Sequence, residues 1–257
     1  ELNNRMNEEV KRRMQFLTFL RFVNIGAFLF ALLARVVWPR PITIPALPLV
    51  PAPFFDAVAG IVFTTLLIWC IRPVRAFPAD RELIEDIGGW LALSLVTLGV
   101  SSMTGPPWEL VSTTISFISL CLVYMKIQHH PRRSPWMRSP VSVLLAWIST
   151  MLLILPFRIL SDFQFTSLFS LSERQWSTSA LALAVIGGLL FIAIHSDWVF
   201  GLALIWYLAG LLFNERLILL QQIVAGIGIM CVLLLCYYVF QKRQRLFRQH
   251  SPKSSSS

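Results

Sequence analysis

Two tryptophans, Trp147 and Trp206, lie near the middle of long apolar segments, whereas most of the other tryptophans lie at segment ends. Tryptophan normally gathers at the two membrane–water interfaces, so a position in the middle of an apolar segment calls for another reason. Ordinary helix packing is one reason. The other is an aromatic-lined pocket between helices, which would take a flat, apolar ligand. Trp147 and Trp206 are therefore the candidate ligand-binding residues.

The positions of the side chains that usually carry catalysis or hold a metal ion argue against both roles. The four histidines, His129, His130, His195 and His250, lie in loops or in the C-terminal tail, so no two of them face each other from helix centres as haem ligands do. No lysine lies inside an apolar segment, which argues against a Schiff base. The carboxylates near the apolar segments lie at segment ends, where capping and interfacial solvation explain them. We predict a non-catalytic protein without a metal site or a cofactor.

The elements that must position the two tryptophans are membrane spans. Hydrophobic residues make up 56% of the 257 residues and charged residues only 14%, whereas about 25% is usual in soluble domains. Runs of about 17–23 apolar residues recur along the chain, each long enough to cross ~30 Å of hydrocarbon. The sequence therefore predicts an integral, all-α, polytopic transmembrane helix bundle in contact with membrane lipids. Its eight predicted spans are Phe16–Val37, Phe54–Ile71, Ile87–Met103, Trp108–Met125, Pro140–Leu155, Trp176–Ile194, Trp198–Phe213 and Ile218–Phe240.

The basic residues give the predicted bundle a sidedness. The formal net charge is +9, but the basic residues are spread over short segments between spans, so we predict no nucleic-acid binding. They gather before the first span, after the second and fourth spans, and after the eighth. The alternate segments hold only Arg40, Arg158, Arg174 and Arg216. By the positive-inside rule, both termini are predicted to lie on the same, cytoplasm-like side.

The chain is predicted to have three parts. Residues 1–15 are a charged N-terminal arm, residues 16–240 a single transmembrane bundle, and residues 241–257 a basic, serine-rich disordered tail. Within the bundle, the proline-rich stretch Pro39–Pro53 cannot form a helix and is predicted to be an extended surface loop.

Two local patterns predict contacts within the bundle. Ser112, Ser116 and Ser119 share one face of their predicted helix, as hydroxyl residues do where membrane helices pack closely. Arg158 and Asp162 are four residues apart, a spacing at which opposite charges pair on one turn of a helix.

One segment resembles a known family. PVSVLLAWIST (Pro140–Thr150), with a proline seven residues before Trp147, resembles the corresponding helix of the longer tryptophan-rich sensory proteins, relatives of the TspO / mitochondrial benzodiazepine receptor family. ISFISLCLVYMK (Ile115–Lys126) and SDWVFGLALIWYLAGLL (Ser196–Leu212) resemble neighbouring segments, so the likeness covers roughly Ile115–Leu235. The family's Pro-x-x-x-Phe-x-x-x-Trp entry to its second helix lacks its tryptophan in the equivalent PAPFFDAVAGIVF.

The resemblance implies a sensor or receptor that binds a tetrapyrrole, a sterol or a similar flat lipophile. Carried over residue by residue, it points to Trp147 and Trp206 only. Two alternatives stay open. The first is a structural or assembly subunit that contacts other membrane subunits of a larger complex through its small-residue faces and charged arms. The second is a lipid or solute facilitator, which would require a continuous polar path through the bundle.

Overall fold

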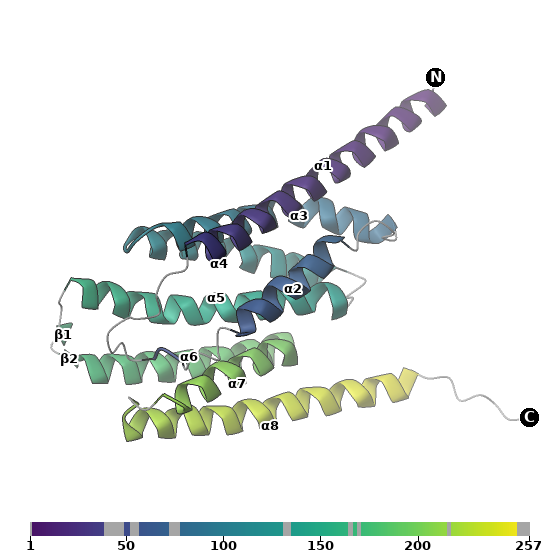
Figure 1. The fold of residues 1–257 in the computed structure, drawn as a ribbon. Helices are drawn as coiled ribbons and strands as arrows, with labels where there is room; N and C mark the ends of the chain where they lie inside the picture. Colours follow the sequence, from purple (N-terminus) through teal and green to yellow (C-terminus); the bar gives the residue numbers. More distant parts are fainter. Residues whose placement is uncertain are drawn as a thin grey trace, which may run out of the picture. The chain divides into compact units, whose positions relative to one another are not determined.

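The computed structural model describes residues 2–38, 49–51, 57–71, 78–130, 135–163, 167–168, 171–214 and 217–250. Within these residues the regular secondary structure is helical apart from one pair of two-residue strands (Figure 1). The chain divides into two compact units. Unit 1 comprises Glu1–Pro45 and Asp56–Gln164, and unit 2 comprises Ala46–Phe55 and Phe165–Ser257.

Unit 1 is built from the first five helices. They are α1 (Leu2–Val37), α2 (Ala57–Ile71), α3 (Pro78–Met103), α4 (Trp108–His129) and α5 (Pro135–Asp162). Helix α3 packs against both α1 and α4, and α5 packs against both α4 and α2. Figure 1 shows the N-terminal end of α1 projecting beyond the other helices of this unit.

Unit 2 contains the last three helices, α6 (Glu173–His195), α7 (Trp198–Leu212) and α8 (Leu219–His250). Before them, strands β1 (Ser167–Leu168) and β2 (Leu171–Ser172) form a short antiparallel pair. Helix α8 packs against both α6 and α7. One buried hydrogen bond ties α8 to α6, since Gln221 Nε2 donates to Ser177 Oγ over 2.7 Å.

The predicted fold class is confirmed, because a helix runs through all or most of each of the eight predicted spans. Six stretches of helix in the described residues are long and apolar enough to cross a membrane, and the apolar parts of α2 and α7 are shorter. The six are Lys11–Val37, Leu83–Met103, Trp108–His129, Met137–Asp162, Glu173–His195 and Leu219–Lys242, and the shorter two are Ala59–Ile68 and Trp198–Leu212. Large apolar side chains such as Leu183 and Ile194 are exposed, which suits a lipid solvent.

The predicted sidedness of the termini and the division into arm, bundle and tail stay predictions. Helix α1 begins at Leu2, inside the predicted arm, and continues without a break into the first span. Helix α8 continues to His250, inside the range that was predicted to be a disordered tail.

The hydroxyl face of α4 packs against α3. Ser116 and Ser119 are buried as predicted, but the third buried position belongs to Thr113 rather than to Ser112. The Ser116 Oγ donates to the main-chain carbonyl of Ser94 over 2.8 Å and lies 3.0 Å from the Ser94 Oγ. Small hydroxyl residues let the two helices approach closely and satisfy each other's polar groups in an apolar surrounding.

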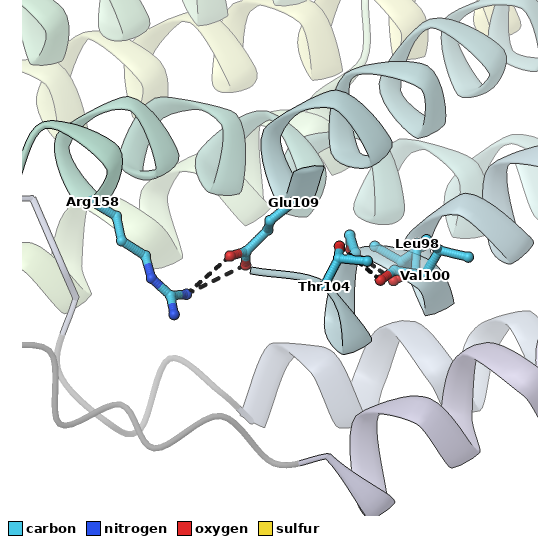
Figure 2. A network of polar contacts seen from close by, with 6 residues as sticks. Leu98, Val100, Thr104, Glu109 and Arg158 are labelled. Carbon is cyan, nitrogen blue, oxygen red and sulfur yellow. Dashed lines mark hydrogen bonds and ion pairs between the residues drawn. The ribbon is translucent and has the colours of Figure 1, made fainter. Parts of the chain in front are cut away.

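Arg158 pairs with a different acid from the one predicted. Its Nη1 lies 3.1 Å from the Glu109 Oε2, so the ion pair joins α5 to the first turn of α4 and not to Asp162 on its own helix. Figure 2 shows the Arg158 side chain reaching toward Glu109. Both side chains are largely shielded, and an ion pair is screened less there than at an exposed position such as that of Asp162.

A glycine marks the closest approach of α3 to α1 and gives a first testable prediction. A Cβ atom at Gly99 would lie 2.5 Å from the Phe30 ring and 3.2 Å from the Ala31 Cα. Gly99→Ala is therefore expected to lower the free energy of unfolding by about 1–2 kcal/mol, since inserted atoms must displace a packed neighbour. The measurement is unfolding of the detergent-solubilised protein in a denaturant series, followed by circular dichroism.

The matched control is Gly89→Ala on the same helix. A Cβ atom at Gly89 meets nothing within 4 Å, so this change is expected to leave stability unchanged or to raise it by about 0.5–1 kcal/mol through helix propensity. Equal losses for the two variants would contradict a close approach at Gly99.

Candidate functional site

The predicted site residue Trp147 lies in α5 with only 3% of its surface exposed. The Phe63 ring of α2 meets it edge-on, with ring centroids 6.4 Å apart and planes inclined at 69°. Phe63 in turn packs edge-on against Phe28 of α1, at 5.8 Å. The guanidinium carbon of Arg35 in α1 lies 5.4 Å from the centre of the Trp147 ring. We call Phe28, Arg35, Phe63 and Trp147 the Trp147 cluster.

The Trp147 cluster contains an unused hydrogen-bond donor. The indole Nε1 of Trp147 is buried and has no acceptor among the residues that the structure describes. Most buried polar groups in proteins are paired, and an unpaired one costs about 1–3 kcal/mol. The indole N–H can only donate. Any group that fits against it and satisfies it must therefore offer an acceptor.

Three helices of unit 1 converge on Trp147, and sequence reasoning identified only one of the side chains involved. Arg35 lies near the end of the first predicted span, and the structure places its guanidinium over the Trp147 ring. Phe63 is the last residue of the segment PAPFFDAVAGIVF, which lacks the tryptophan found in the family's second-helix motif. Its phenyl ring brings an aromatic contact to the cluster from α2. The presence of an aromatic residue in this segment is the sequence signal that could have identified Phe63.

The second predicted site residue, Trp206, lies in α7 of unit 2 with 40% of its surface exposed. Its chain neighbour Tyr207 is turned inward and is almost fully buried. Trp147 and Trp206 thus belong to different units, and a shared role for them stays a prediction.

A segment before α2 is held inside unit 2, next to α7. The Tyr207 hydroxyl donates to the Leu49 carbonyl over 3.0 Å, and the Asn214 Nδ2 donates to the Val50 carbonyl over 2.7 Å. Leu49 is completely buried and has a φ of 67°, in the left-handed region. The predicted surface loop Pro39–Pro53 is therefore wrong at Leu49, which is buried and whose carbonyl accepts a hydrogen bond from Tyr207 of α7. The stretches 39–48 and 52–53 of that prediction lie outside the described residues.

The start of α7 is fixed by a buried acid. Asp197 has no exposed surface, and its Oδ1 accepts from the main-chain N–H groups of Val199 (3.1 Å) and Phe200 (3.3 Å). This confirms for Asp197 the capping role that was predicted for acids at segment ends. Across the described part of the chain, no group of three or more His, Cys, Asp or Glu side chains could hold a metal ion.

The helices and their outward-facing apolar side chains define an integral, multi-pass helical membrane protein. A family model described as TSPO-like protein matches residues 43–240. This match covers well over half of the 257 residues, so the chain belongs to the TSPO-like protein family. The resemblance predicted from the sequence is thereby confirmed, and the match includes all of the stretch on which it rested. Neither a curated protein nor a solved structure matches the chain.

Proposed function

We propose that this protein is a non-catalytic, sensor- or receptor-like membrane protein that binds a flat lipophile of the tetrapyrrole or sterol type. The Trp147 cluster is the proposed centre of the site, and Trp206 is the second proposed ligand-binding residue. The observation that carries the proposal is the buried indole of Trp147, whose N–H has no acceptor among the described residues. Membership of the TSPO-like family is consistent with this proposal.

The chemistry of the Trp147 cluster suits binding better than turnover. Apolar and aromatic walls with a few polar groups that fix orientation are the usual composition of small-molecule sites. Phe28, Phe63 and Trp147 offer aromatic surface, while the indole N–H and Arg35 offer polar contacts. None of the four is a carboxylate, histidine or thiol, the groups that most often act as acid, base or nucleophile.

Protoporphyrin IX is a suitable probe of the proposed function, because its own fluorescence reports binding without reliance on the protein's nine tryptophans. Titration into the full chain in detergent micelles is expected to saturate. Trp147→Phe and Trp206→Phe are each expected to raise the Kd about fivefold, which corresponds to the ~1 kcal/mol of one lost aromatic contact.

The matched control for this titration is Trp108→Phe. Trp108 is 67% exposed at the start of α4, and its replacement is expected to leave the Kd unchanged. A linear, non-saturating signal, or equal effects in all three variants, would refute a specific site.

A further inference from the structure

We propose that the C-terminal part of α8 is a binding surface for the headgroups of anionic phospholipids. We call the range Lys242–His250 the α8 extension. Its basic residues are Lys242, Arg243, Arg245 and Arg248. The α8 extension belongs to unit 2, whereas the Trp147 cluster belongs to unit 1. The inference therefore goes beyond the proposed function and does not depend on it.

The first step of the argument is the length of α8. Its apolar part, Leu219–Lys242, is long enough to cross a membrane. The helix nevertheless continues to His250, and Figure 1 shows its C-terminal end beyond the ends of α6 and α7. At 1.5 Å per residue the α8 extension adds about 12 Å, whereas the headgroup layer on one side of a bilayer is about 5–8 Å thick. A helix that leaves the hydrocarbon near Lys242 therefore carries the basic residues through the headgroup layer.

Exposed aromatic side chains indicate where α8 meets that layer. Tyr237 and Tyr238 are both exposed on α8, immediately before the α8 extension. Trp198 at the start of α7 is also exposed, and its carbonyl accepts from the Cys236 Sγ over 3.9 Å, which places Trp198 beside the same turn of α8. Tyrosine and tryptophan gather at the membrane–water interface. The α8 extension therefore begins on the water side of an aromatic belt.

The third step is the charge balance of unit 2. The last acid of the chain is Glu215, which precedes α8. Of the other two acids of unit 2, Glu173 begins α6, at the opposite end of that helix from the turn that leads to Trp198. Asp197 lies beside the aromatic belt but is completely buried, and its Oδ1 accepts from two main-chain N–H groups. In the described part of unit 2, no exposed acid lies at this end to attract the α8 extension.

The position of the α8 extension favours a lipid surface over a soluble acidic partner. Lys242, Arg245 and Arg248 follow each other at three-residue spacing, so they occupy successive turns along one side of the helix. Clusters of basic residues that directly follow a membrane span attract anionic lipids, and ammonium and guanidinium groups bind phosphate strongly. The bilayer that α8 crosses supplies phosphate groups at high effective concentration. A soluble partner would first have to be captured from solution.

The basic residues at the start of the first span provide a contrast. Lys11, Arg12 and Arg13 are exposed in α1. Glu8 and Glu9 precede Arg12 and Arg13 by four residues, the spacing at which opposite charges pair on a helix. We therefore expect this second basic group to attract anionic lipids less than the α8 extension does.

The test measures which lipid the full chain retains in non-ionic detergent micelles. The protein is incubated at low salt with equal amounts of phosphatidylserine and phosphatidylcholine that carry the same acyl chains. Gel filtration removes free lipid, and mass spectrometry quantifies the retained lipid. The unmodified protein is expected to prefer phosphatidylserine about fivefold. A micelle has no sides, so the result does not depend on the orientation of the chain in a membrane.

A charge-neutral variant is expected to lose this preference. Its four changes are Lys242→Gln, Arg243→Gln, Arg245→Gln and Arg248→Gln, and its preference is expected to fall to about 1.5-fold or less. A salt concentration of about 1 M is expected to have the same effect on the unmodified protein, because the Debye length falls to about 3 Å.

Two matched controls separate charge from damage to the helix. The first keeps the charge through Arg243→Lys, Arg245→Lys and Arg248→Lys, and it is expected to keep the preference near fivefold. The second neutralises the exposed group of α1 through Lys11→Gln, Arg12→Gln and Arg13→Gln, and it is expected to keep a preference of about threefold or more. Circular dichroism checks that the helices of each variant are intact.

Three results would overturn the inference. The first is equal retention of the two lipids by the unmodified protein, and the second is an equal loss of preference in the two charge-neutral variants. The third is saturable binding of polyglutamate without any preference between the lipids, which would assign the α8 extension to an acidic protein partner. None of these results bears on porphyrin binding, so the proposed function stands or falls by its own titration.

Discussion

Replacement of Trp147 by alanine is expected to lower the free energy of unfolding by about 3–5 kcal/mol, the range for truncation of a large buried aromatic side chain. Trp147 is 3% exposed and packs edge-on against Phe63, while Arg35 lies over its ring. Removal of the indole leaves a cavity and deprives side chains from two other helices of their contact. The loss is measured by denaturant titration in micelles with circular dichroism as the signal.

The control for this prediction is the other tryptophan in the middle of a predicted span. Trp206 is 40% exposed, so Trp206→Ala is expected to lower stability by no more than about 1 kcal/mol. If the two alanine variants lost equal stability, the burial of Trp147 in unit 1 would be contradicted. The size of the Trp147→Ala effect is also the reason that the binding experiments use phenylalanine, which keeps a ring at that position.

Asp197→Ala is expected to lower the free energy of unfolding by about 2–3 kcal/mol. The Asp197 carboxylate is completely buried and accepts from two main-chain N–H groups at the start of α7. An alanine there would leave both donors without their acceptor, in a place from which water is excluded. The same denaturant titration measures the loss.

Asp197→Asn separates the cap from the charge. Asparagine caps helices about as well as aspartate, so this variant is expected to retain all but about 1 kcal/mol of the stability. If Asn and Ala at position 197 were equally damaging, the negative charge itself, rather than the acceptance of two N–H groups, would be what Asp197 contributes.

The features that could be predicted from the sequence are those that depend on neighbouring residues. Length and hydropathy alone identify a helix, and a helix runs through all or most of each predicted span. A mid-span tryptophan was enough to identify Trp147 as unusual, and Asp197 was recognised as an acid at a helix start. The TSPO-like family could be named for the same reason, since its signature lies in continuous segments.

The features that could not be predicted join residues far apart in the chain. Arg158 was assigned to a partner on its own helix because four-residue spacing is visible in a sequence, whereas the approach of α4 and α5 is not. Arg35 lies near the end of a span, where basic side chains usually reach for water, and nothing local shows that an indole from α5 lies within its reach. Leu49 was assigned to the surface because Tyr207, which donates to its carbonyl, comes much later in the chain.

That last contact has a consequence for synthesis. Leu49 and Val50 are held by side chains 158 and 164 residues further along the chain. At the ribosome's pace of about 5–20 residues per second, about 8–32 s pass between the appearance of Leu49 and that of Tyr207. In the nascent chain, Leu49 and Val50 therefore lack these two hydrogen bonds while helices α2 to α6 are synthesised. During that interval Leu49 and Val50 have been synthesised, but Tyr207 and Asn214, which bind their carbonyls, have not.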